Sequence, residues 1–155
     1  MTKNKLYTSV FILNEANVLL GMKKRGFGVG RWNGFGGKVD ADETILEAAK
    51  RELLEESGLT VNELQEAGIL KFEYLGESEI LEVHVFTACK FEGTPTESEE
   101  MRPKWFPIPE VPYNDMWPDD RLWFPLMFRG QKFSGYFKFN GHLEIQDYTL
   151  EPACT

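Results

Sequence analysis

The chain has 155 residues, 42% of them hydrophobic and 14% aromatic, which suits one globular domain rich in β structure, predicted to span residues 1–155. Its formal net charge of −8 argues against a protein that binds nucleic acid polymers, because such proteins need a positive surface to hold phosphates. No apolar run approaches the roughly 18 residues that would span a membrane, so no membrane partner is expected either.

Two strands and a glycine-rich loop are predicted at the start of the chain. Alternating apolar residues indicate strands at Leu6–Leu13 and Asn17–Lys23, joined by a turn. Residues 24–33 then form a loop with three glycines. This loop is either a flexible connector or a ligand-binding loop, and Phe27 and Trp32 favour the second interpretation because they are costly to expose.

A helix is predicted after Glu43. Asp42 or Thr44 can cap its beginning, alanine and leucine favour its middle, and Gly58 can end it in the left-handed conformation. Ahead of the helix, residues 34–37 include three glycines. Their backbone can turn tightly and bring carbonyl oxygens close to a ligand.

Three carboxylates share one side of this helix. At 100° per residue, Glu52, Glu55 and Glu56 fall within an arc of roughly 100° that borders the apolar stripe of Ala49 and Leu53. A solvated acidic face is the ordinary interpretation of such a helix, but carboxylates at the edge of a core repel one another and need a compensating cation. Oxygen ligands of this kind suit a hard divalent cation such as Mg²⁺, which commonly bridges to substrate phosphate.

The second half of the chain predicts five strands and a second helix. The helix is expected at Asp119–Phe128, where Pro118 opens it and Pro125 would bend or shorten it. The strands are expected at Glu66–Leu75, Ile80–Phe91, Lys104–Phe106, Lys132–Phe139 and Leu143–Leu150. Strands before, between and after two helices predict an α/β fold in which a mixed β-sheet is sandwiched by helices.

The segment from Gly37 to Leu59 matches a known motif. The pattern G-x5-E-x7-R-E-U-x-E-E-x-G-U, with U an aliphatic residue, is met at Gly37, Glu43, Arg51, Glu52, Leu53, Glu55, Glu56, Gly58 and Leu59. The chain therefore resembles the Nudix hydrolases. This resemblance implies the Nudix fold, an α/β/α sandwich with a mixed β-sheet in which the motif forms a loop, a helix and a loop.

A second group of candidate residues lies in WPDDRLWF, residues 117–124. Aromatic faces stack on purines, and the paired carboxylates of Asp119 and Asp120 can accept from or donate to base edges. The alternative is a plain helix start, with Asp119 as the cap and the aromatic side chains in the core. Two adjacent carboxylates in a partly buried pocket rarely both ionise, so one could keep a proton and read a purine with an altered tautomer or an added oxo group.

Within the Nudix hydrolases, nearly the whole chain resembles the MutT-homologue group of vertebrate oxidised-purine nucleoside triphosphatases. Matching segments include LLGMKKRGFGVGRWNGFGGKV, ESEEMRPKWF, MWPDD and GYFKF. The resemblance implies Mg²⁺-dependent hydrolysis of oxidised purine (deoxy)nucleoside triphosphates, such as 8-oxo-dGTP and 2-hydroxy-dATP, to the monophosphate and pyrophosphate. Mn²⁺ would be a substitute cation, and the reaction would cleanse the nucleotide pool of mutagenic precursors.

The same resemblance implies the residues of the site. Substrate binding would involve Thr8, Lys23, Phe27, Asn33, Phe35, Gly36, Gly37, Lys38, Phe72, Met101, Trp117, Asp119, Asp120, Trp123 and Phe139. The metal would be held by Glu52, Glu55, Glu56, Glu100 and the carbonyl of Gly36. In catalysis, Glu56 or Glu52 would take a proton from the attacking water. Arg51 would orient a neighbouring carboxylate, and Glu43 would help close the loop against the helix.

Some expectations stay more general. Leu81 departs from the methionine that the resemblance implies there, which bears on the preference among purines. Other interpretations are a preference for methylated purine triphosphates or another nucleoside diphosphate derivative, and a nucleotide-binding module without catalysis.

We expect a monomer whose partner is a small oxidised purine nucleotide. Cys89 and Cys154 are too few for a disulfide framework, so a reduced, cytoplasmic protein is expected, with the nucleus or mitochondria as further compartments. His84 and His142 are expected to be structural.

Overall fold

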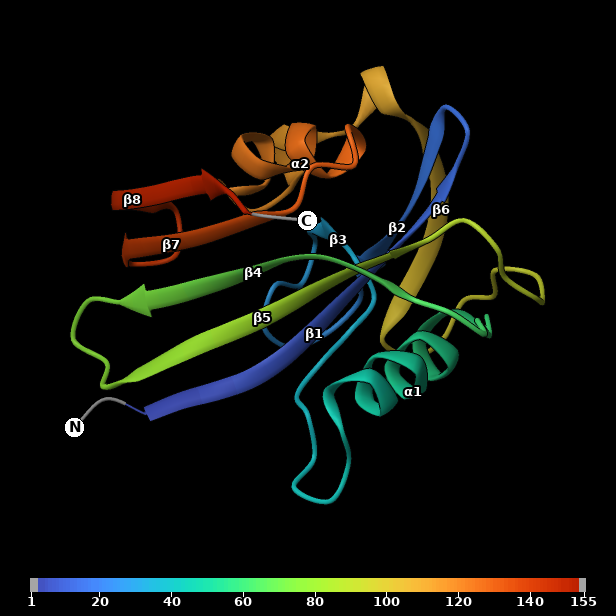
Figure 1. Cartoon of the computed structure of the whole chain (residues 1–155), viewed down its shortest axis with the longest axis horizontal. Coiled ribbons are helices and arrows are strands. Elements are labelled where there is room, and N and C mark those ends of the chain that lie inside the picture. The colour runs from blue at the N-terminus through green and yellow to red at the C-terminus, as the bar shows by residue number, and fades with distance from the viewer. Residues whose placement is uncertain (1–2, 154–155) are drawn as a thin grey trace.

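A mixed β-sheet and two helices make up the fold (Figure 1). The computed structural model describes residues 3–153. Its strands are β1 (Lys3–Asn14), β2 (Asn17–Lys23), β3 (Trp32–Asn33), β4 (Gln65–Tyr74), β5 (Glu79–Ala88), β6 (Met101–Pro107), β7 (Phe133–Asn140) and β8 (Glu144–Pro152). The helices are α1 (Ile45–Ser57) and α2 (Asp120–Phe128), and two 3-10 turns, η1 (Ile108–Glu110) and η2 (Tyr113–Asp115), lead from β6 to α2.

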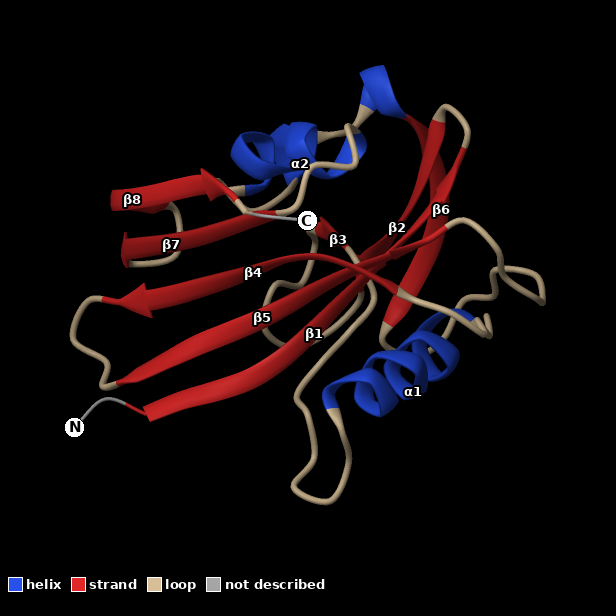
Figure 2. Cartoon of the chain, viewed as in Figure 1, coloured by secondary structure: helices blue, strands red, loops and turns tan. Residues whose placement is uncertain are grey.

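The sheet joins segments that lie far apart in the sequence (Figure 2). Strand β1 runs parallel to β5, and β4 runs parallel to β7, whereas the pairs β1–β2, β4–β5 and β7–β8 are antiparallel. Neighbours follow in the order β3-β2-β1-β5-β4-β7-β8, and β6 also pairs with β2. The hairpin of β7 and β8 therefore extends the sheet beside β4, next to strands from the first half of the chain.

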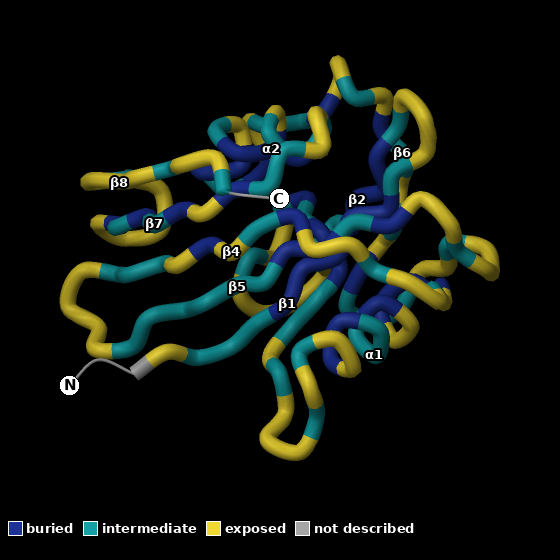
Figure 3. Tube along the Cα trace, viewed as in Figure 1, coloured by how far each residue is buried: buried dark blue, intermediate teal, exposed yellow. Residues whose placement is uncertain are grey.

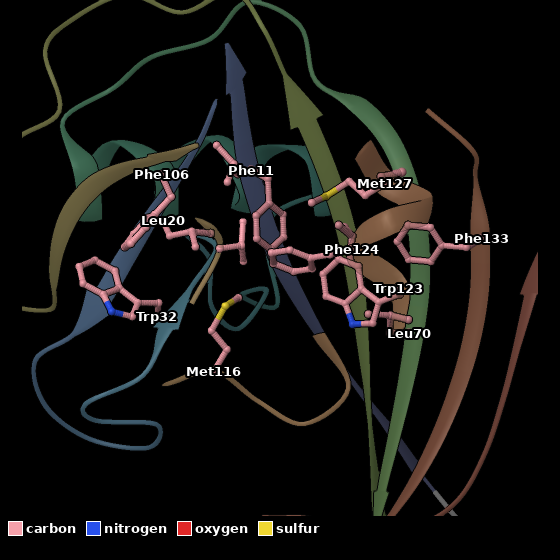
Figure 4. Close-up of a cluster of buried hydrophobic side chains, with 14 of the residues drawn as sticks. Phe11, Leu20, Trp32, Leu70, Phe106, Met116, Trp123, Phe124, Met127 and Phe133 are labelled. Carbon is pink, nitrogen blue, oxygen red and sulfur yellow. The ribbon is translucent and has the colours of Figure 1, made fainter. Parts of the chain in front are cut away.

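The alternation of side chains along β1 places the two helices on opposite faces of the sheet. Val10 and Ile12 are buried in one cluster with Leu53 of α1. Phe11, between them, points to the other face and packs edge-on against Phe124 of α2, with ring centroids 5.1 Å apart. Figure 4 shows this second cluster, and Figure 3 shows buried residues along the strands where the helices cover them. The predicted α/β/α sandwich is confirmed.

Helix α1 begins and ends at the predicted signals. The Thr44 hydroxyl accepts a hydrogen bond from the backbone N–H of Glu47 at 3.1 Å, and the Glu47 carboxylate accepts one from the N–H of Thr44 at 2.8 Å. Gly58 ends the helix with a φ of 78°, and its N–H donates to the carbonyl of Leu54 at 2.9 Å. Of the two residues predicted to cap the helix, Thr44 does so and Asp42 does not.

Three elements differ from the prediction. The predicted loop at residues 24–33 ends in the short strand β3, because Trp32 is buried with its ring centroid 4.8 Å from that of Phe106. Strand β6 is longer than predicted. Its prolines are tolerated because β6 is paired on one side only, with β2, so a missing backbone N–H on the other side breaks no hydrogen bond of the sheet. Pro125 stands inside α2, but the helix continues to Phe128 as if uninterrupted.

Two further features bear on the sequence analysis. Cys89 is exposed and free, and Cys154 lies outside the described residues, so the reduced state stays a prediction. Across residues 3–153, the structure contains no helix of the length and hydrophobicity that crossing a bilayer requires.

The Thr44 cap gives a prediction about the stability of the motif helix. Replacing Thr44 with Ala should lower the free energy of unfolding by about 1 kcal/mol, because the N–H of Glu47 loses its acceptor. Thr44→Ser is the matched control, since it keeps the hydroxyl and should keep the stability. Urea unfolding measures both variants, and an alanine variant as stable as the wild type would show that the cap contributes nothing.

Candidate active site

The acidic side of α1 borders the core. Leu53 is fully buried, and Glu56 on the same side of the helix is only 6% exposed. The Glu52 side chain is mostly covered, while that of Glu55 is more open to solvent. The interpretation of this side as a solvated acidic face is therefore wrong for Glu52 and Glu56. Two carboxylates are held at the edge of an apolar core, where their charges are poorly hydrated.

Arg51 supplies positive charge to this helix. Its Nε and Nη2 donate to the two oxygens of Glu43 at 3.0 and 2.6 Å, and its Nη1 donates to Glu52 Oε1 at 2.7 Å and Glu55 Oε2 at 3.3 Å. The bidentate bond, with a further bond from the N–H of Asp40, lowers the pKa of Glu43 to about 2. Arg51 thus ties the preceding loop to the helix and orients Glu52, although a part in catalysis for either residue stays a prediction.

The glycine-rich segment before α1 comes too close to its neighbours for any side chain. A Cβ atom on Gly36 would lie 1.8 Å from the carbonyl oxygen of Thr8, and one on Gly37 would lie 1.9 Å from Glu52 Oε2. The N–H of Gly36 donates to Glu56 Oε1 at 3.0 Å. The segment therefore brings backbone groups directly against the carboxylates of α1.

Glu56 has no cationic hydrogen-bond partner among the described residues. Burial, together with the nearby charge of Glu52, raises the pKa of Glu56 to about 8, against the stabilising N–H of Gly36. Burial also raises the pKa of Glu52, although Arg51 opposes it. A carboxylate whose charge is disfavoured in this way takes up either a proton or a cation.

The chemistry of these donors fits a hard divalent cation. The candidate ligands are all oxygens, from the carboxylates of Glu52 and Glu56 and the backbone of Gly36, and the oxygen of Glu52 that faces Gly37 makes no bond to Arg51. Within the described range 3–153, no three His, Cys, Asp or Glu side chains converge as a metal cluster. A cation here would therefore take further oxygens from backbone, water or substrate phosphate.

Glu100, another expected metal ligand, is hydrogen-bonded to two basic residues. Its carboxylate accepts from Arg25 Nε at 2.6 Å and from Lys23 Nζ at 3.0 Å, and these bonds lower its pKa. Its charge acts on Glu56 and raises the pKa there, so the two carboxylates are neighbours. Ligation by Glu100 would require one of these basic side chains to move, and it stays a prediction.

A cavity of about 650 Å³ opens beside the glycine-rich segment. This volume is typical of sites for small molecules. Glu56 lines it, and so do most of the residues expected to bind substrate. These are Thr8, Lys23, Phe27, Asn33, Gly36, Gly37, Phe72, Met101, Trp117, Asp119, Asp120, Trp123 and Phe139. The fold thus brings two of the expected metal ligands, Gly36 and Glu56, to the same cavity as the expected base contacts. The other expected ligands, Glu52, Glu55 and Glu100, do not line it.

Asp119 and Asp120 are almost fully buried at the start of α2. Asp119 Oδ2 accepts from Trp123 Nε1 at 2.8 Å, and Asp120 Oδ2 accepts from the backbone N–H of Trp117 at 3.0 Å. Asp119 stands at the N-cap position of α2 and Trp123 and Phe124 lie in the core, as the alternative interpretation expected, but the Asp119 side chain makes no capping bond. Burial raises the pKa of both carboxyls, and the charge of Asp119 raises that of Asp120 further. The pair therefore retains a proton above the usual range of aspartate and offers a donor beside an acceptor.

Two expected substrate contacts do not line the cavity. The prediction that Phe35 contacts substrate is wrong, because its side chain is fully buried in the core beneath α1. Its place there follows from its neighbours: residue 35 pairs with Val10, whose side chain points to the α1 face. Lys38 is exposed outside the cavity, and its carbonyl accepts from Arg51 at 3.3 Å. Leu81, the departure from the resemblance, does line the cavity.

Three aromatic residues of the cavity, Tyr7, Tyr74 and His142, were missed in the sequence. Tyr74 follows Phe72 by two residues on β4, and this spacing could have identified it because alternate side chains of a strand share a face. His142, expected to be structural, lines the cavity edge-on to Phe27 and Trp117, with ring centroids 5.1 and 6.3 Å apart. It has no local signal, since only the pairing of β7 with the distant strand β4 brings it there.

Comparisons with known proteins agree with this geometry. Residues 3–127 match the model of the NUDIX domain. The chain is 57% identical to the oxidized purine nucleoside triphosphate hydrolase of Danio rerio, over 97% of both chains. It is 56% identical to the protein of the same name from Mus musculus, over 97% of this chain and 96% of that one. The crystal structure of a mutator MutT protein from Bacillus halodurans aligns with a TM-score of 0.84 and 29% identity, over 97% of this chain and 99% of that chain.

The buried carboxyl pair gives a prediction about pH. Because burial raises the pKa of Asp119 in the folded protein to about 6, against an ordinary value of 3.8, folding takes up protons between these pH values. The contribution of the pair to the free energy of unfolding is therefore present at pH 4 and falls as the pH rises through 6. Relative to Asp119→Asn, which keeps an acceptor for Trp123, the wild type should lose on the order of 2 kcal/mol between pH 4 and 7.

Urea unfolding of both proteins at several pH values measures this difference. Carboxylates elsewhere titrate alike in the two proteins, so they cancel in the comparison. A difference that does not change with pH would mean that Asp119 ionises normally in the folded protein.

Proposed function

Since the chain belongs to the Nudix hydrolase family, we propose that it hydrolyses oxidised purine nucleoside triphosphates to the monophosphate and pyrophosphate, using Mg²⁺ or, as a substitute, Mn²⁺. The substrates we propose are 8-oxo-dGTP and 2-hydroxy-dATP, in line with the names of the Danio rerio and Mus musculus relatives. A monomer that cleanses the nucleotide pool of the cytoplasm is part of the same proposal.

One observation carries this proposal: Glu56 of the motif helix and the pair Asp119 and Asp120 line the same cavity. The first is a buried carboxylate that needs a cation, and the second is a buried donor and acceptor pair that can read a base edge. A nucleoside triphosphate has the matching parts, with phosphates that bind a cation at one end and a purine at the other.

At the phosphate end of the cavity, we propose that residues of α1 bind the cation and accept a proton. Glu52, Glu56 and the carbonyl of Gly36 would hold the cation, which supplies positive charge that neutralises phosphate oxygens and acidifies the attacking water. Glu56 or Glu52 would accept the proton of that water. Arg51 would keep Glu52 in place through its bond of 2.7 Å. Water attacks phosphorus directly, so no covalent intermediate with the protein is needed.

The base end of the cavity would select oxidised purines. Phe72 and Trp117 offer aromatic faces, and base stacking on such faces contributes roughly 1–3 kcal/mol per base. Asn33, from β3, and the two aspartates would bond to the base edge. Because the aspartate pair presents both a donor and an acceptor, it can pair with the changed pattern of donors and acceptors that oxidation gives to a purine.

The catalytic role of Glu56 can be tested by removing its charge. Glu56→Gln should lower kcat for 8-oxo-dGTP by at least ~100-fold, the scale of losing one group that stabilises the transition state. The fold should persist, because the amide oxygen can still accept from the N–H of Gly36. Glu63→Gln makes the same change at an exposed position and should have no effect. Turnover at the wild-type rate in Glu56→Gln would remove Glu56 from the mechanism.

The base-reading role of Asp119 can be tested with a panel of nucleotides. Replacing Asp119 with Ala should reduce the ratio of kcat/KM for 8-oxo-dGTP over dGTP, because the purine loses its charged or protonated partner. Asp115→Ala, at an exposed position nearby, should keep the ratio. Steady-state kinetics with normal, oxidised and methylated purine triphosphates, with the products identified, gives the ratios. A ratio unchanged in Asp119→Ala would contradict the proposed reading of the base.

A further inference from the structure

Tyr74 continues a row of cavity residues along β4. Leu70, Phe72 and Tyr74 are spaced by two, so their side chains share one face of the strand, and all three line the cavity. Leu70 is buried at the inner end of this row, whereas Tyr74 is the last residue of β4 and is partly exposed. The tyrosine thus lies toward the mouth of the cavity, on a wall separate from α2, which holds the aspartates.

Packing on both sides fixes the ring of Tyr74. It stacks on Phe139 of β7, with centroids 5.6 Å apart and planes inclined by 27°, and β7 pairs with β4 at this register. His142 meets it edge-on at 5.7 Å. A ring held by two neighbours presents its hydroxyl in one direction, so little freedom is lost when the hydroxyl binds a ligand.

The hydroxyl of Tyr74 is unsatisfied by the protein. No hydrogen bond joins it to any side chain or backbone group that the structure describes, yet no buried side-chain nitrogen or oxygen there lacks a partner. The hydroxyl is therefore not enclosed in the core, and its residue lines the cavity. Burial of the side chain and the charge of Asp119 raise the pKa of Tyr74 to about 12, so the hydroxyl keeps its proton at neutral pH.

We propose that the Tyr74 hydroxyl donates a hydrogen bond to an oxygen of the bound purine nucleotide and so contributes to substrate affinity. This inference rests on the proposed function. The phosphates would lie at Glu56, whereas Tyr74 stands with Phe139 and His142 on the β4 and β7 wall. The hydrogen bond is therefore remote from the reacting phosphorus and stabilises the bound substrate and the transition state equally.

Two kinds of oxygen in a nucleotide could accept this bond. One is the oxygen that oxidation adds to the base, and the other is an oxygen of the sugar or purine that normal nucleotides also carry. Both accept a hydrogen bond from a protonated hydroxyl. They differ in which nucleotides would bind more weakly when the hydroxyl is removed.

The test replaces Tyr74 with Phe, which removes the hydroxyl and keeps the ring against Phe139. Tyr148→Phe is the matched control, because Tyr148 is exposed on β8 and stacks on Phe137 away from the cavity lining. For 8-oxo-dGTP, Tyr74→Phe should raise KM roughly 2- to 12-fold, the range of one neutral hydrogen bond, and leave kcat unchanged. The dissociation constant of 8-oxo-dGMP, measured by calorimetry, should rise by the same factor, while thermal unfolding and the control variant match the wild type.

The substrate panel identifies the acceptor. A rise in KM for 8-oxo-dGTP but not for dGTP assigns the oxygen added to the base, and an equal rise for both assigns an oxygen that the two nucleotides share. Wild-type KM and dissociation constants in Tyr74→Phe would overturn the inference even if the wild-type enzyme prefers oxidised purines. A wild-type enzyme with no such preference would instead overturn the proposed function, and the two failures are thus distinguishable.

Discussion

The site depends on one electrostatic arrangement, in which Arg51 bonds to three carboxylates of the motif while Glu56 has no cationic hydrogen-bond partner among the described residues. Like charges one helical turn apart destabilise an isolated helix, and burial at the edge of a core makes their repulsion stronger. Arg51 offsets this by bonding to Glu43, Glu52 and Glu55 at once. The carboxyl of Glu56 is left where the backbone of the glycine-rich segment meets the helix.

This arrangement connects stability to chemistry. A buried carboxylate such as Glu56 costs free energy in the protein alone, and the cost is recovered only when a cation or proton arrives. Sites that bind a divalent cation and phosphate together place the cation between protein carboxylates and phosphate oxygens, which would otherwise repel one another. The same reasoning applies at the other end of the cavity, where burial of Asp119 and Asp120 retains a proton that a solvated aspartate would lose. In our proposal, one group of buried carboxyls holds the cation and the other reads the base.

Much of this could be predicted from the sequence, because its signals are local. The spacing of carboxylates around Leu53, the capping residue Thr44 and the terminal glycine Gly58 act within α1, and the structure confirms its ends and its acidic edge. Contacts between distant segments could not be predicted in this way. Phe35 has the same kind of side chain as Phe72, yet it faces the opposite side of the sheet because of its pairing with β1. His142 follows the last strand residue of β7, and only the pairing of β7 with the distant strand β4 brings it to the cavity.

The central claim is that one nucleotide spans both ends of the cavity, with its phosphates and a cation at Glu52 and Glu56 and its purine at Asp119 and Asp120. Anomalous diffraction from a crystal grown with Mn²⁺ and a non-hydrolysable analogue of 8-oxo-dGTP tests this most directly. The account predicts a manganese peak bonded to the carboxylate of Glu56 and to phosphate oxygens, with the purine edge against the two aspartates. A peak elsewhere on the protein, or a purine bound outside the cavity, would contradict it.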